Sequence, residues 1–107
     1  MLHQKIIKIP IFNYRVYVYI FDHKKEIQDI YSTDDTWEAC TLEAADYCSL
    51  LLPNNKYFLG NLTHECTHVK NCLFRYIGQE CARDNDEIEA YILEYLLQQI
   101  YTFYQKI

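Results

Sequence analysis

The sequence predicts a single α+β domain in which short antiparallel strands are followed by two long helices. The first half of the chain holds short runs of Ile, Val, Tyr and Phe separated by turn signals, which is typical of strands. From residue 61 the apolar residues recur at helical spacing, and a second helical pattern extends almost to the last residue. With 107 residues, 2 Gly and 2 Pro, the composition is that of a folded chain with one modest core. We therefore expect residues 1–107 to form one domain.

The first strand pair is predicted over residues 6–12 and 14–21. Asn13 marks a tight turn between the two strands. Pro10 cannot donate a ladder hydrogen bond, so it restricts the first strand to an edge position or ends it early.

A short helix and a second strand pair follow. Asp22 is a candidate N-cap for a helix that extends to Ile30, and residues 32–35 close that helix as a loop. Residues 37–42 and 47–52 have strand composition and are expected to pair across a turn.

The first long helix is predicted from residue 61 to the C-cap Gly78, and the second over residues 86–104. His64 and His68 lie about 200° round the first helix from its apolar stripe, so this helix has a core face and a nearly opposite ligand face. The apolar stripe is formed by Leu62, Cys66, Val69, Leu73 and Ile77.

Composition and charge exclude several classes of function. The chain has 10 basic against 15 acidic residues and a net charge of −5, whereas phosphate backbones demand clustered Lys and Arg, so we expect no nucleic-acid partner. The first residues lack an apolar signal region, and no run approaches a membrane span. The 5 cysteines form an odd set without C-x-x-C spacing, which argues against a disulfide framework. We therefore expect a cytoplasmic protein with reduced thiols.

The strongest functional signal is the motif H-E-x-x-H at residues 64–68. His64 and His68 are four residues apart on one helical face and can bind a single Zn²⁺, and Glu65 lies where it can deprotonate a bound water. A catalytic zinc site needs a third protein ligand. The acidic residues near enough for a helix–loop–helix return are Glu80, Asp84, Asp86, Glu87 and Glu89.

A second motif follows, in which residues 87–90 read E-I-E-A. H-E-x-x-H followed by E-x-x-A on a second helix resembles the gluzincin branch of zinc metallopeptidases. More closely, the chain resembles the very small zincin-like proteins of bacteriophage and prophage genomes. These proteins share a strand-rich front, a histidine helix and a second helix of E-x-x-A-Y-L type, in which Ile92 here replaces the leucine.

The resemblance implies that His64, His68 and Glu87 bind Zn²⁺ and that Glu65 is the general base. In the larger relatives, a carboxylate one turn after the ligand glutamate orients a zinc-bound histidine. Tyr91 stands at that position here, so a phenol takes this role or the role is absent.

The sequence leaves the ligand set open at two positions. Glu87 is favoured as third ligand because the connection length and the E-x-x-A match both select it. However, Asp84-x-x-Glu87 and Asp86-x-x-Glu89 are also capping-box patterns, and Glu89 shares a stripe with apolar residues, where a ligand belongs. Cys72 lies four residues beyond His68 and is a candidate fourth ligand, although buried packing is the preferred interpretation.

These observations predict a zinc-dependent metallopeptidase that cleaves a peptide or protein substrate. Family members bind an extended peptide along an edge strand, and residues 47–52 are the best candidate for that strand. The main alternative is a non-catalytic phage accessory or virion protein that keeps a zincin fold with a structural or vestigial zinc site and binds a viral partner. A helical interaction module with an accidental motif is the third interpretation. The compartment implied is the host cytoplasm, or the virion in the alternative.

Overall fold

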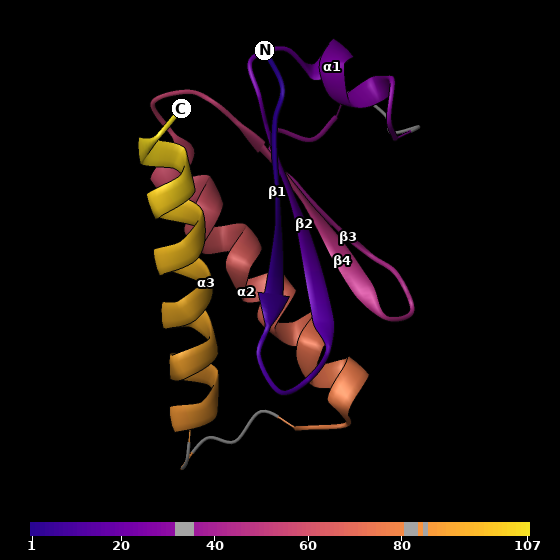
Figure 1. Ribbon diagram of the computed structural model, residues 1–107, viewed down its shortest axis with the longest axis vertical. Coiled ribbons are helices and arrows are strands. Elements are labelled where there is room, and N and C mark those ends of the chain that lie inside the picture. Colours follow the sequence, from indigo (N-terminus) through magenta and orange to yellow (C-terminus); the bar gives the residue numbers. More distant parts are fainter. Residues whose placement is uncertain (32–35, 81–83, 85) are drawn as a thin grey trace.

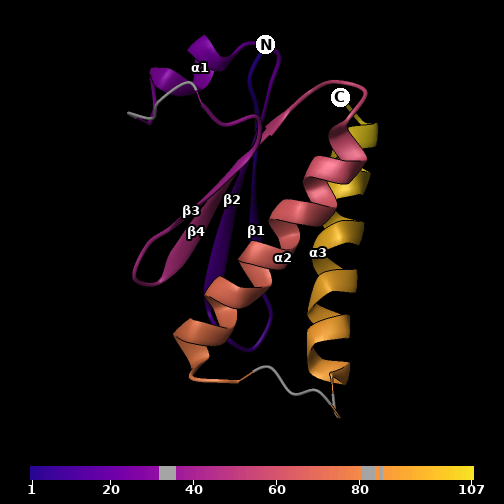
Figure 2. The same cartoon turned by 180° about the vertical axis from the view of Figure 1, so that it is seen from behind.

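The computed structural model describes residues 1–31, 36–80, 84 and 86–107, and confirms the α+β class. A four-stranded sheet in this part of the chain carries two long helices on one face, and a short helix lies near the N-terminus (Figures 1 and 2). The elements are β1 (His3–Ile9), β2 (Tyr14–Phe21), α1 (Lys24–Gln28), β3 (Cys40–Glu43), β4 (Tyr47–Pro53), α2 (Phe58–Ile77) and α3 (Glu87–Gln105). The expected loop at residues 32–35 lies outside the described residues, and so does Cys81, one of the 5 cysteines.

The sheet is mixed, and this corrects the purely antiparallel arrangement expected from the sequence. The strand order is β1-β2-β4-β3. Both predicted hairpins form, since β1 pairs antiparallel with β2 and β3 pairs antiparallel with β4. The chain crosses over between the hairpins, so β2 and β4 are parallel neighbours. The expectation that residues 47–52 form an edge strand is wrong, because β4 pairs on both sides and β3 is the edge.

The strand boundaries differ from those predicted for local reasons. β1 starts earlier than expected and ends before Pro10, where the proline removes a backbone donor. Ile11 and Asn13 adopt positive φ angles of 78° and 52°, which turn the chain into β2. The third strand, expected over residues 37–42, forms only over Cys40–Glu43.

Helix α1 begins one residue later than expected. Its N-cap is His23 in place of Asp22. The Glu26 carboxylate accepts hydrogen bonds from the backbone N–H groups of both Asp22 and His23, each at 2.9 Å, and so satisfies donors that the helix leaves free.

The core lies between the sheet and the two long helices. Alternate residues of β2 and β4 point toward the helices, and the predicted apolar stripe of α2 meets them. A smaller apolar cluster occupies the opposite face of the sheet, beneath α1. The innermost side chains of the main core are Val16, Val18, Ile20, Leu50, Leu52, Leu62, Cys66, Val69, Leu73, Leu96 and Ile100.

The two long helices agree closely with the sequence prediction. α2 starts at Phe58, one turn before the expected residue 61, and Gly78 ends it in the left-handed conformation with φ 71°. α3 begins directly after Asp86, whose side chain makes no capping hydrogen bond. None of the helices among the described residues is long and apolar enough to cross a membrane.

Candidate metal centre

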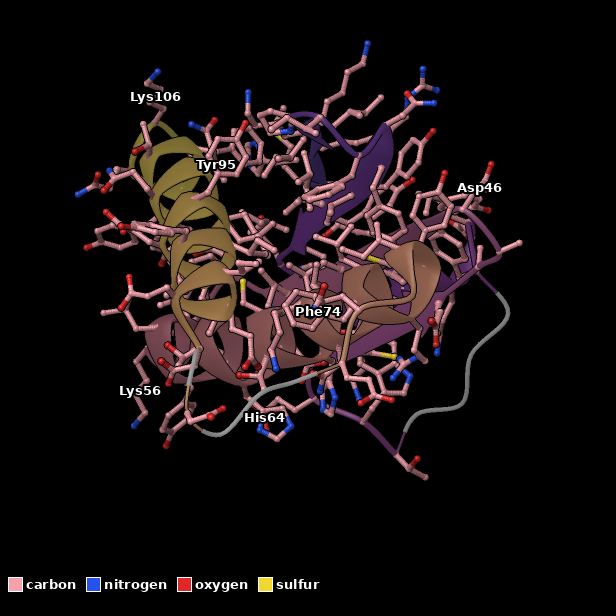
Figure 3. All side chains as sticks on the ribbon, turned by 90° about the horizontal axis from the view of Figure 1, so that it is seen from below. Asp46, Lys56, His64, Phe74, Tyr95 and Lys106 are labelled. Carbon is pink, nitrogen blue, oxygen red and sulfur yellow. The ribbon has the colours of Figure 1, made fainter. Side chains whose placement is uncertain are left out.

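His64 and His68 lie on consecutive turns of α2, and both are exposed. Their ring centroids are 5.0 Å apart with an interplanar angle of 72°. His64 projects from the side of α2 that faces away from β1 and β2 (Figure 3). The prediction that the two histidines share a face away from the apolar stripe is thus confirmed.

Glu65 differs from the histidines because it is buried, with only 6% of its surface exposed. One residue along a helix rotates a side chain by about 100°, which turns Glu65 from the histidine face toward β3. There its Oε1 accepts a hydrogen bond of 2.9 Å from Thr41 Oγ1. Its other oxygen, Oε2, lies 3.7 Å from Nε2 of His64. The carboxylate therefore bridges the space between the edge strand and the histidine pair.

A cleft of about 350 Å³ brings these groups together between α2 and β3. One donor atom from each of His64, Glu65 and His68 lies within 4.8 Å of the other two, and this is the one group of potential metal ligands among the described residues. The cleft is lined by Ala39, Cys40, Thr41 and Glu43 from the β3 side and by His64, Glu65, His68, Cys72 and Arg75 from α2.

An ion pair at one end of the cleft ties β3 to α2. Nε and Nη2 of Arg75 contact the Glu43 carboxylate at 2.9–3.2 Å. Hydrogen bonds from Arg75 hold the pKa of Glu43 below its ordinary value, since they favour the charged carboxylate. Both side chains are exposed, so this pair fixes the position of the strand more than it adds stability.

The surroundings of Cys72 and Cys66 shift their thiol pKa values in opposite directions. A hydrogen bond from Cys48 lowers the pKa of Cys72, and Arg75, whose Nη2 lies 3.4 Å from its Sγ, lowers it further. Burial raises the pKa of Cys66 to about 12, and the charge of Glu65 adds to this effect. Cys72 is 3% exposed, in agreement with the packing interpretation, and it does not belong to the group of donor atoms formed by the histidines.

Glu87 does not lie in the group of donor atoms that contains the two histidines. It is exposed in the first turn of α3, outside the group of donor atoms. Its neighbour Glu89 accepts a hydrogen bond of 2.7 Å from Nζ of Lys70 on α2. Lys70 lies two residues beyond His68 and therefore about 200° round the helix, so the first turn of α3 packs on the far side of α2 from the histidines. The ligand role of Glu87 stays a prediction from the resemblance.

Tyr91, which stands where the larger relatives carry the carboxylate that orients a zinc-bound histidine, is also on α3 and is 65% exposed. A larger hollow of about 560 Å³ lies between α2 and α3, but its lining is mostly apolar and contains neither histidine. Among the residues that the structure describes, the group of potential metal ligands therefore lies at the α2–β3 cleft and not between α2 and α3.

Comparison of the chain with known protein families, with characterised proteins and with solved structures finds no match. Geometry and chemistry alone carry what is inferred about function.

Sequence reasoning missed the role of Thr41 in the site and the burial of Lys70 on the far side of α2. Thr41 falls within a predicted strand, but its contact with Glu65 depends on β3 lying beside α2, which no local pattern indicates. Lys70 is only 7% exposed. The one sequence signal for this burial is that Lys70 follows Val69, a residue of the apolar stripe. The apolar stripe that Glu89 shares indicates an inward-facing side chain, which the sequence interpretation assigned as a possible metal ligand. In the structure Glu89 is the ion-pair partner of Lys70.

Proposed function

We propose that His64 and His68 bind one Zn²⁺ and that the protein is a small zinc-dependent peptidase in which Glu65 transfers protons. The observation that carries the proposal is the position of the Glu65 carboxylate. It is buried in the wall of the cleft, held by Thr41 and 3.7 Å from a histidine nitrogen. A buried carboxylate beside two exposed imidazoles is a suitable arrangement for a general base next to a metal.

The chemistry of the donor set fits zinc. Imidazole nitrogens and carboxylate oxygens are both common zinc ligands, bound at 2.0–2.2 Å. Tetrahedral geometry at such bond lengths separates donor atoms by roughly 3.3 Å. The ligand atoms of His64 and His68 lie within 4.8 Å of each other, and both imidazoles are exposed, so rotation of the rings can close the difference.

In this proposal the chain's own residues would supply a general base and a strand that binds the substrate. Bound Zn²⁺ would polarise the scissile carbonyl and acidify the attacking water. Glu65 would accept the proton of that water and return it to the leaving amine. β3 is an edge strand on the wall of the cleft, and an extended peptide can add to it by main-chain hydrogen bonds, which replaces β4 as the expected substrate strand.

Metal content and peptide cleavage test this proposal together. Wild-type protein should contain about one Zn²⁺ per chain by elemental analysis, and the His64→Ala/His68→Ala variant should contain none. His3→Ala is the matched control, because that histidine lies on β1 outside the cleft. Glu65→Gln should fold and bind zinc but cleave an unstructured peptide library at least a hundredfold more slowly. Equal zinc in the wild-type and double-variant proteins would refute the site.

A non-catalytic accessory protein with a structural metal is the second candidate function. One observation favours it: the group of donor atoms among the described residues contains Glu65 and not Glu87. If Glu65 itself completes the metal site, the protein has no general base and the bound ion serves to fix β3 against α2. Zinc-loaded wild-type protein that cleaves nothing across a broad library would support this function over the peptidase.

A further inference from the structure

We propose that Thr41 is a positioning residue that keeps Glu65 out of the metal's coordination shell and so determines whether Glu65 acts as a base or as a ligand. The inference rests on the proposed metal site of His64 and His68. It deepens that proposal by naming the group on which the choice between peptidase and structural site depends.

The contact between Thr41 and Glu65 is specific. Thr41 Oγ1 lies 2.9 Å from Oε1 of Glu65 and 3.3 Å from the backbone carbonyl oxygen of the same residue. The single hydroxyl proton is donated most favourably to the charged carboxylate, because charge-assisted hydrogen bonds are the stronger ones. Buried Glu65 has little access to water that could replace this donor. The hydroxyl of Thr41 therefore fixes one carboxylate oxygen toward β3.

The strand that carries Thr41 is itself held in place. Thr41 pairs with Leu50 of β4, and Leu50 is fully buried in the core. Glu43, two residues along on the same face of the strand, is paired with Arg75 of α2. Thr41 therefore approaches Glu65 from a strand that is fixed at both positions, and the hydrogen bond has a defined direction.

With this hydrogen bond in place, Oε2 of Glu65 lies 3.7 Å from His64 Nε2, and the donor atoms of Glu65 and the two histidines lie within 4.8 Å of one another. Ligands of one tetrahedral Zn²⁺ lie roughly 3.3 Å apart, so the bond to Thr41 holds Glu65 just beyond the separation of co-ligands. A carboxylate freed from Thr41 can rotate toward the cation and become a third ligand. As a ligand it can no longer accept the proton of the attacking water.

The experiment uses Co²⁺ in place of Zn²⁺, because the visible spectrum of Co²⁺ reports the number and type of its ligands. Thr41→Val removes the hydroxyl at nearly constant shape, and Thr41→Ala serves as a second variant if the valine protein does not fold. Thr41→Ser keeps the hydroxyl. Thr102→Val is the matched control, since it removes a threonine hydroxyl on α3, which contributes no residue to the cleft.

The expected result is a changed Co²⁺ spectrum and tighter metal binding for Thr41→Val, with kcat lowered about 10- to 100-fold and KM unchanged. Thr41→Ser and Thr102→Val should match wild type in all these measurements. A Co²⁺ spectrum and metal affinity identical in Thr41→Val and wild type would overturn the inference and leave the proposed function standing. Failure of the wild-type protein to bind Co²⁺ or Zn²⁺ would overturn the proposed function, and the inference with it.

Discussion

Glu65 is held between two groups that favour different roles for it. Thr41 binds one oxygen of its carboxylate, and the other oxygen faces the histidine pair. A buried carboxylate with a single neutral donor is costly unless a cation is near, because burial removes the water that solvates its charge. A metal ion on His64 and His68 would supply that positive charge. The burial of Glu65 is therefore better explained with a cation in the cleft than without one.

The third ligand can be tested at the same scale by comparing two glutamates of α3. We expect Glu87→Gln to change neither stability nor zinc content, because Glu87 is exposed and lies outside the donor group. Glu89→Gln should lower the free energy of unfolding by about 1–3 kcal/mol, since it removes a negative charge 2.7 Å from the buried Lys70 ammonium. Chemical denaturation and chelator titration measure both quantities. Loss of zinc from Glu87→Gln alone would show that α3 supplies a ligand, as the resemblance implies.

At the scale of elements, the site depends on the short edge strand β3. Four residues form it, and within the described part of the chain they pair with β4 alone. Two side-chain contacts join β3 to α2, namely the Thr41–Glu65 hydrogen bond and the Glu43–Arg75 ion pair. The strand is therefore the wall of the cleft, and its position sets the geometry of the carboxylate.

The contribution of the Glu43–Arg75 pair should depend on pH. The pKa of Glu43 in the folded protein is below its ordinary value of 4.5, so its stabilisation is present above pH 4.5 and is lost as the pH falls through the folded-state pKa. Glu43→Gln should lower stability by roughly 0.2–1 kcal/mol at pH 7, because the pair is exposed. Melting temperatures measured from pH 7 to pH 3 should converge for the two proteins. A difference that persists unchanged at pH 3 would contradict an electrostatic origin.

The local patterns of the chain predict its helices and strands well but not how they assemble. The stripe from Leu62 to Ile77 and the turn at Gly78 predict the end of α2 to the residue and its start to within one turn, since both signals are contained in the helix itself. The parallel pairing of β2 with β4 could not be predicted, because it depends on the crossover between hairpins. The contact that buries Glu65 against β3 could not be predicted either, because it depends on how β3 and α2 assemble. The histidine pair was predictable because one helical turn contains it.

At the scale of the whole molecule, the sheet separates two apolar clusters. β2 and β4 contribute alternate residues to both, with Val18 and Leu50 on the helix side and Tyr19 and Leu51 on the other. His64 and His68 lie outside both clusters, and His64 projects from the outer side of α2 (Figure 3). The proposed metal centre thus lies outside the packed cores, so variants of the histidines are expected to fold.

The two clusters should unfold together, because the central strands belong to both. Trp37, the one tryptophan, packs on Phe21 beneath α1 and reports the smaller cluster by fluorescence, while circular dichroism reports α2 and α3 on the opposite face. Leu96→Ala, which truncates a fully buried side chain of α3, should destabilise by about 2–5 kcal/mol. If residues 1–107 form one cooperative domain, both signals shift equally in denaturant. Leu59→Ala, at a side chain 56% exposed, is the matched control and should shift neither signal appreciably. A fluorescence transition that stays in place while the helical signal moves would show that the outer cluster unfolds independently.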